Sequence, residues 1–173
     1  MNLYFQDESR FGLMTKNGKS LTARGVKPIC KFQQVFRSTY LFGAFSPITG
    51  HSLQLILPKC NGDNFQIFMD NLSSNNPDEL KIMVLDNGAF HKTRKLNVPD
   101  NIALIFLPPY SPELNPAEKM WAKYKRQFSN LLFNSLDTLE DFMCKLVVNT
   151  TTSEINSICR YSYIFSDDFW VII

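Results

Sequence analysis

The sequence predicts an α/β fold in which helices flank a mixed β-sheet. Three features indicate it: a hairpin pattern in the first third, two short continuous apolar runs in the middle, and helical spacing of apolar residues between and after those runs. Strands followed by alternating helices and strands are typical of a sheet covered by helices. The chain has 173 residues, 45% of them hydrophobic, so we expect residues 1–173 to form a single domain.

The predicted strands differ in how their apolar residues are arranged. Leu3, Phe5 and Asp7 fall on one side of an opening strand at period two. Residues 2–6 also resemble the tail of a protease-cleavable tag, but we interpret them as native strand. The two continuous apolar runs at 82–85 and 102–107 suit strands buried on both faces. In chain order we expect strands at 1–7, 34–45, 51–57, 81–85 and 102–107.

The predicted helices have apolar faces and recognisable first residues. Asn115 is a good N-cap, and Pro116 suits the first position of a helix. Trp121, Tyr124 and Phe128 then follow at helical spacing, so Trp121 is expected to lie in the core rather than to stack on a base. We expect helices at 61–72, 116–130 and 136–148.

The net charge of +2 conceals a segregation of charges. From Arg10 to Arg37 there are seven basic residues and no acidic one, within a stretch whose residues 12–31 indicate a loop or loose hairpin. Such clusters can form a surface for a polyanion, but they can equally be a solvated face. Two further basic clusters are His91, Lys92, Arg94 and Lys95, and Lys119, Lys123, Lys125 and Arg126. Acidic residues gather at Asp137, Glu140 and Asp141, and at Asp167 and Asp168.

Other features exclude several classes of protein. None of the four cysteines belongs to a CxxC pair or has a histidine at zinc-ligand spacing, so reduced thiols are expected. No apolar run approaches the roughly 18 residues of a membrane span. The first residues lack the pattern of a signal peptide. We therefore expect a cytoplasmic location and no membrane partner.

Three carboxylates could form a metal site. Asp7 and Asp86 each follow an apolar strand, and on adjacent strands they could share a hard cation such as Mg²⁺, which prefers oxygen ligands. Each could also simply end its strand, because aspartate is common in turns. Glu118 lies three residues after Asn115, where it could complete a capping box, bind a metal, or do both. Glu8 points opposite Asp7 in a strand and is expected on the exposed surface.

Three blocks of sequence together carry a resemblance to a known family. The most specific is Leu-Pro-Pro-Tyr-Ser-Pro-Glu-Leu-Asn-Pro-Ala-Glu-Lys-Met-Trp at 107–121. It is preceded by Val-Leu-Asp-Asn-Gly-Ala-Phe-His-Lys at 84–92 and Phe-Gln-Asp-Glu-Ser-Arg-Phe-Gly at 5–12. In this order the blocks resemble bacterial insertion-sequence transposases of the mariner superfamily. The spacing between the second and third acidic positions is slightly shorter than in typical mariner relatives.

The resemblance implies a ribonuclease H-like fold and a catalytic, metal-binding triad of Asp7, Asp86 and Glu118. Two Mg²⁺ ions, for which Mn²⁺ would substitute, would clamp the attacking and leaving oxygens of an in-line displacement. Asp7 would bridge the ions. Water would cut double-stranded DNA at the element end, and the freed 3′-hydroxyl would then attack a target containing a TA step.

Supporting roles follow from the same resemblance and from residue chemistry. Asn87 could brace Asp86. His91 could orient a phosphate or water near the site, although a structural hydrogen bond at the start of a helix is favoured slightly. Phosphate contacts position DNA without reading its sequence. Candidates for them are Arg10, Lys92, Lys119 and Lys123.

Partners and alternatives remain open at this point. Family members pair two element ends, which implies a homodimer, and usually carry an N-terminal helix-turn-helix region for which no room exists before Asp7. We therefore expect a separate DNA-binding region, a nucleoid-associated role in a bacterium, and weak, salt-sensitive DNA binding by this chain alone. One alternative is that the chain is another ribonuclease H-like nuclease, but the Pro-Pro-Tyr-Ser-Pro block argues against it. Another is that the chain is an inactive remnant, or a DNA-binding and oligomerisation module derived from a transposase. The presence of all three acidic positions weakens this second alternative.

Overall fold

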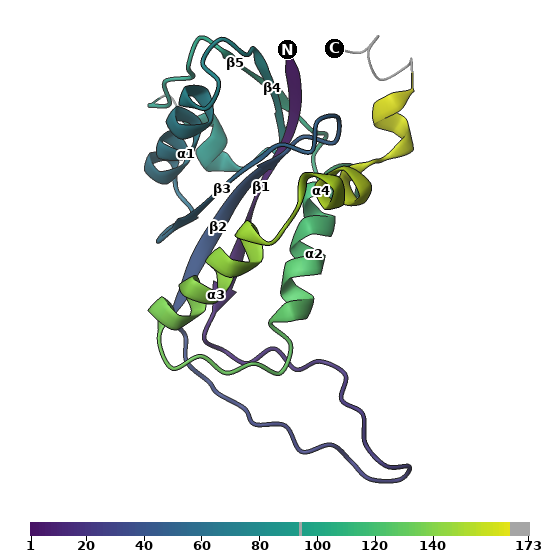
Figure 1. Cartoon of the computed structure of the whole chain (residues 1–173). Helices are drawn as coiled ribbons and strands as arrows, with labels where there is room; N and C mark the ends of the chain where they lie inside the picture. The colour runs from purple at the N-terminus through teal and green to yellow at the C-terminus, as the bar shows by residue number, and fades with distance from the viewer. Residues whose placement is uncertain (94, 167–173) are drawn as a thin grey trace.

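A single mixed sheet forms the centre of the molecule, in a computed structural model that describes residues 1–93 and 95–166 (Figure 1). Its strand order is β3-β2-β1-β4-β5. The first three strands pair antiparallel, and β4 and β5 run parallel to β1. The mixed sheet predicted from the sequence is therefore confirmed. The strands are β1 (Asn2–Gly12), β2 (Ser38–Phe45), β3 (Ser52–Leu57), β4 (Lys81–Leu85) and β5 (Ile102–Phe106).

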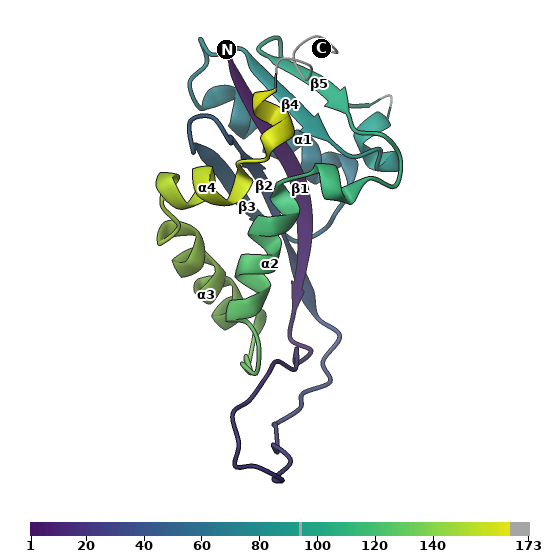
Figure 2. The same cartoon turned by 90° about the vertical axis from the view of Figure 1, so that its right-hand side faces the viewer.

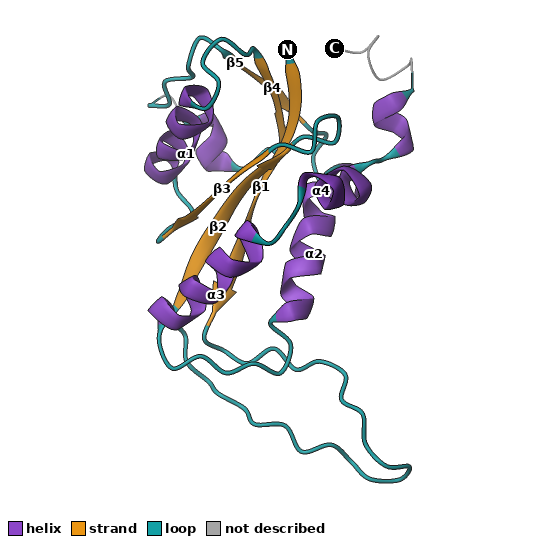
Figure 3. Ribbon diagram, in the orientation of Figure 1, coloured by secondary structure: helices purple, strands orange, loops and turns teal. Residues whose placement is uncertain are grey.

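Helices cover both faces of this sheet (Figure 3). One face carries α1, and the other carries α2, α3 and α4. The sequence analysis missed α4, although Thr151 and Glu154 form a capping box at its start. No helix in the described ranges is long and apolar enough to cross a membrane. The helices are α1 (Gly62–Ser74), α2 (Ala117–Gln127), α3 (Leu136–Val148) and α4 (Thr152–Cys159), with short 3₁₀ turns at 89–92, 112–114 and 162–165.

The alternation of side chains along β1 divides the core between the two faces. Tyr4 packs with α1, whereas Phe11 packs with α2 and α3. Trp121 and Tyr124 of α2 are each 1% exposed and lie in the core cluster that contains Phe11, as predicted. Asp7 and Phe11 are four positions apart on β1, so their side chains lie on the same face. The packing of Phe11 against α2 and α3 therefore also fixes the face on which Asp7 lies.

A long arm, residues 13–37, projects from the body between β1 and β2 (Figures 1 and 2). Two backbone hydrogen bonds hold its base, from Leu13 to Arg37 and from Thr15 to Gln33, both 3.0 Å. The expected loose hairpin is confirmed. The expectation that a strand starts at residue 34 is wrong, because residues 34–37 belong to this arm and regular pairing begins at Ser38. Arg94, Asp167 and Asp168 lie outside the described residues.

Candidate active site

The two aspartates meet because β1 and β4 are parallel neighbours. The last paired residues of this ladder are Phe5 and Val84, so Asp7 and Asp86 each follow two residues later. Asp7 does not end its strand as expected: β1 continues to Gly12 along β2, and only its pairing with β4 stops. This break leaves the carboxylate beside an open edge of the sheet.

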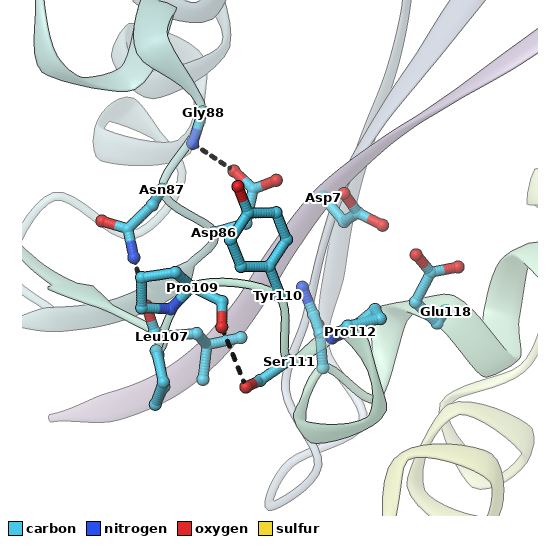
Figure 4. Close-up of a pocket in the computed structure, with 12 residues that line it drawn as sticks. Asp7, Asp86, Asn87, Gly88, Leu107, Pro109, Tyr110, Ser111, Pro112 and Glu118 are labelled. Carbon is cyan, nitrogen blue, oxygen red and sulfur yellow. Dashed lines mark hydrogen bonds between the residues drawn. The ribbon is translucent and has the colours of Figure 1, made fainter.

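Glu118 comes to the same place from the first turn of α2. All three carboxylates line one cavity of about 480 Å³, together with residues 107–112 of the loop after β5. Figure 4 shows Asp7 and Glu118 directed into shared space, with Asp86 on the other side of Asp7. Three segments that are distant in the sequence thus contribute one carboxylate each to a single hollow.

Asp7 is held by the core beneath it. The indole nitrogen of Trp121 donates a hydrogen bond of 2.8 Å to an oxygen of Asp7. Gly43, the residue paired with Asp7 on β2, makes this possible, because a Cβ there would lie 2.7 Å from the Trp121 ring. Burial, followed by the charges of Glu8 and Glu118, raises the pKa of Asp7 to about 7.

Asp86 is exposed, with a side chain 60% accessible. One of its oxygens accepts a hydrogen bond of 2.8 Å from the backbone nitrogen of Gly88 and lies 3.0 Å from Nδ1 of His91. A Cβ at position 88 would approach both Asp86 and His91 to 3.0 Å, so a glycine permits this compact turn. Asp86 is therefore braced on the side away from Glu118.

Glu8 is not on the exposed surface as expected. Its side chain is 7% exposed, and an oxygen lies 3.1 Å from Nε2 of the buried His91. His91 thus bridges Glu8 and Asp86. Burial lowers the pKa of His91, but the contacts with Glu8 and Asp86 outweigh it and the net shift is upward. The hydrogen bonds agree with the structural role favoured for His91.

Glu118 does not complete the capping box that its position allowed, because the Asn115 backbone nitrogen donates to the Pro112 carbonyl. The cap position of α2 is Pro116, which makes no side-chain cap bond, and α2 begins at Ala117. Asn115 instead accepts a hydrogen bond from the Ala117 nitrogen at 3.1 Å and donates one of 2.9 Å to the Gln6 carbonyl of β1. This tether fixes the start of α2 beside β1 and leaves the exposed Glu118 side chain free to face the cavity.

The donor set suits a divalent cation, although its side chains do not converge on one point in this conformation. Among the described residues, no three acidic, histidine or cysteine side chains are close enough to hold an ion together. Asp7, Asp86 and Glu118 nevertheless offer the carboxylate oxygens that Mg²⁺ prefers. Burial, followed by the charges of Glu8 and Glu118, raises the pKa of Asp7, and a bound cation would oppose that shift. These three residues are therefore the candidate metal ligands of the cavity.

We predict that Mg²⁺ reverses a loss of stability at neutral pH. The pKa of Asp7 is about 7 in the folded state and near 3.9 when unfolded, so the folded state binds this proton more tightly. The free energy of unfolding should fall by about 3 kcal/mol as pH rises from 4 to 7, and by about 4 kcal/mol once pH has passed the folded pKa, through this group alone. Thermal denaturation against pH, with and without Mg²⁺, measures this.

Asp7→Asn is the matched control for that measurement. It keeps the shape of the side chain and removes the titration, so the variant should lose this part of the pH dependence and most of the stabilisation by Mg²⁺. A wild-type profile that matches the variant with and without the metal would contradict the assignment.

The other predicted residues are distributed unevenly. Asn87 lines the cavity and donates a hydrogen bond to the Leu107 carbonyl, which ties the end of β4 to the end of β5. Lys92 bonds the Asn87 side chain, so it lies at the rim. Lys119 lies over the ring of Tyr161, 3.9 Å from its centroid, near the C-terminal segment.

Two predicted phosphate contacts lie away from the triad. Lys123 forms an ion pair of 3.0 Å with Glu154 of α4 and is thereby engaged within the protein. Arg10 bonds the Ser38 hydroxyl at 3.0 Å, three residues further along β1 than Asp7. The structure does not bring these two cations to the cavity that holds the triad.

Sequence reasoning missed several residues that shape the site. Trp121 and Asp7, which share a hydrogen bond, lie 114 positions apart in the sequence, so no local pattern predicts their contact. Tyr110 is fully exposed at the cavity rim and has a positive φ of 59°, which is uncommon for a bulky residue. The Pro-Pro pair before Tyr110 and Pro112 after it were the available signal for a rigid loop.

Comparison with known proteins agrees with this arrangement. Residues 2–140 match the model of the DDE superfamily endonuclease family, so the chain belongs to that family. It is 38% identical over 107 residues to an uncharacterized protein, y4pE/y4sA, of Sinorhizobium fredii (strain NBRC 101917 / NGR234). That match covers 61% of this chain and 79% of the relative.

The fold is ribonuclease H-like and similar to that of the mariner transposase Mos1. A Mos1 pre-cleavage transpososome superimposes with a TM-score of 0.73 at 16% identity, covering 91% of this chain and 52% of the Mos1 chain. Mos1 paired-end complexes with Mn and with Mg give TM-scores of 0.68 and 0.70, each at 18% identity with 91% of this chain covered. This chain spans about half the length of those Mos1 chains.

Proposed function

We propose that this domain is the catalytic part of an insertion-sequence transposase that cuts and rejoins DNA with the help of Mg²⁺ or Mn²⁺. One observation carries the proposal: β1, β4 and α2 each bring a carboxylate to the same cavity. Family membership supports it, as do the Mos1 structures described with Mg and with Mn. The expected triad is Asp7, Asp86 and Glu118.

The residues of the chain would divide the work as follows. A bound pair of cations would stabilise charge on the attacking and leaving oxygens of the phosphodiester. Asp7 and Glu118 would hold the metal from the inner side, and Asp86 from the loop side. Trp121 would orient Asp7, and His91 would orient Asp86, while Asn87 would hold the loop after β5 through the Leu107 carbonyl. The rigid loop from Pro108 to Pro112 would form the wall against which the DNA strand lies.

End recognition and pairing are further parts of the proposal. Related Mos1 structures are described as paired-end complexes with DNA of the transposon end. We infer that this chain likewise works as a homodimer on double-stranded DNA, with a TA step in its target. We also infer that residues 1–173 act as one catalytic domain and that a separate region selects the element ends.

A cleavage assay tests this function. The substrate is a supercoiled plasmid that carries the genomic flanks of the gene, because an insertion sequence would have its ends there. With Mg²⁺ or Mn²⁺, and with the separate end-binding region supplied alongside, the protein should nick the plasmid at the element ends and leave 3′-hydroxyl groups. Absence of nicking in both metals would favour the inactive remnant, and nicking that survives EDTA would contradict the metal-dependent mechanism.

A further inference from the structure

A second cavity lies at the base of the arm, at the far end of α2 from the triad. It has a volume of about 570 Å³ and is lined by β1, by both sides of the arm, by α2 and by the loop after α2. Four cations contribute to its lining, and no carboxylate does. They are Arg10, Lys16, Arg37 and Lys125.

These cations are not neutralised by the protein. Within residues 1–93 and 95–166, none of the four belongs to an ion pair. The only side-chain hydrogen bond described for any of them is that of Arg10 to the Ser38 hydroxyl. Four uncompensated positive charges around one hollow repel each other, so an anionic ligand would relieve the repulsion.

The floor of the cavity is aromatic. Phe11 and Phe128 pack together with ring centroids 4.8 Å apart, and Phe133 lies 5.5 Å from Phe128. Phe36 of the arm also lines the cavity, and its side chain is 73% exposed. Cations beside an accessible aromatic ring are the combination with which proteins bind unpaired nucleotides, because phosphates meet the cations and bases stack on the rings.

The cavity is aligned with the candidate active site. Glu118 and Lys125 are seven residues apart on α2, which places them on one side of the helix about 10 Å apart. Ala122, exposed and small, lies on the same side between them. Phe11, which lines the second cavity, follows Asp7 by four positions on β1, on the same face and about 13 Å along the strand. A strand of DNA could therefore pass from one cavity to the other.

We propose that this second cavity binds unpaired nucleotides of the DNA strand that passes the active site. The alignment rests on the proposed function, but the binding chemistry does not. Lys125 and Arg37 would contact phosphates, and the exposed Phe36 ring would stack on a base. The cavity would thus hold DNA that has been opened near the point of cleavage.

The test measures DNA binding in EDTA, so that loss of cleavage cannot affect it. Fluorescence anisotropy compares a blunt duplex with the same duplex carrying a short single-stranded extension, over a series of salt concentrations. Wild type should prefer the extended DNA. Phe36→Ala should lower affinity for the extended DNA by about 5- to 100-fold and abolish the preference. Lys125→Gln should reduce the slope of log K against log salt by about 1 on the extended DNA.

Two matched controls lie outside the cavity. Phe32→Ala removes another exposed arm phenylalanine that does not line the cavity, and Lys145→Gln removes an exposed lysine from the last turn of α3. Both should bind as wild type does. Equal affinity of wild type for the two DNAs, or Phe36 and Lys125 variants that match their controls, would overturn the proposal. So would a Phe36→Ala effect confined to the oligomeric state in sedimentation.

Discussion

Replacing Asp86 with alanine should reduce metal-dependent nicking by at least about 10²-fold, the loss that follows removal of one group that stabilises transition-state charge. Asp86 has little structural work to do. Its side chain is 60% exposed, and its contacts are confined to the adjacent turn at Gly88 and to His91. We therefore expect the free energy of unfolding to change by no more than about 1 kcal/mol.

The control for this variant is Glu113→Ala. Glu113 is an exposed carboxylate in the turn before α2, and it does not line the cavity. Initial rates of plasmid nicking at saturating Mn²⁺ measure both variants, with thermal denaturation of each protein alongside. Unchanged nicking by Asp86→Ala would remove Asp86 from the triad. An equal loss of nicking in Glu113→Ala would show that nicking depends on the overall charge of the protein and not on Asp86 itself.

Much of the fold could be predicted because local patterns coincide with burial. The continuous apolar run of β4, residues 82–85, is buried at all four positions, and α3 spans the predicted residues 136–148. The prediction failed where a distant contact decides the local structure. The side-chain oxygen of Asn115 still accepts a hydrogen bond from the Ala117 nitrogen, but its amide also donates to the Gln6 carbonyl of β1, 109 positions away. The Asn115 backbone nitrogen donates to the Pro112 carbonyl, so Glu118 does not complete the capping box.

The candidate site shows the same division. Asp7, Asp86 and Glu118 could be proposed from the resemblance, and the parallel pairing of β1 with β4 explains why two of them meet. Glu8 was misplaced because alternation along a strand says only that it faces away from Asp7. That opposite face is covered here by the turn that carries His91, so Glu8 is buried against a partner. Which face is solvated depends on tertiary packing, and one strand cannot reveal it.

Trp121→Ala should lower the free energy of unfolding by about 3–5 kcal/mol, since it removes a large side chain that is 1% exposed. The indole packs edge-on against Phe45, with centroids 5.4 Å apart, above the space left by Gly43. Chemical denaturation monitored by circular dichroism measures the loss. A cost below about 1 kcal/mol would show that the tryptophan does not fill the core as described.

Trp121→Phe separates packing from the hydrogen bond to Asp7. It retains an aromatic ring and deletes the indole donor, which lowers the pKa of Asp7 in the wild type. Without that donor the pKa of Asp7 should rise further, so more of the carboxyl is protonated at pH 7 and Mg²⁺ should bind less tightly there than at pH 8. Calorimetric titration with Mg²⁺ at both pH values measures this shift.

Tyr124→Phe is the matched control for that titration. Tyr124 is equally buried on the same helix and also loses hydrogen bonds, but those are to Gln54 and Thr150, not to a carboxylate of the triad. A shift in the pH dependence of Mg²⁺ binding in Trp121→Phe alone would show that the core positions Asp7 through one specific donor. Equal shifts in both variants would mean that looser packing of α2 is sufficient, and that the hydrogen bond has no separate role.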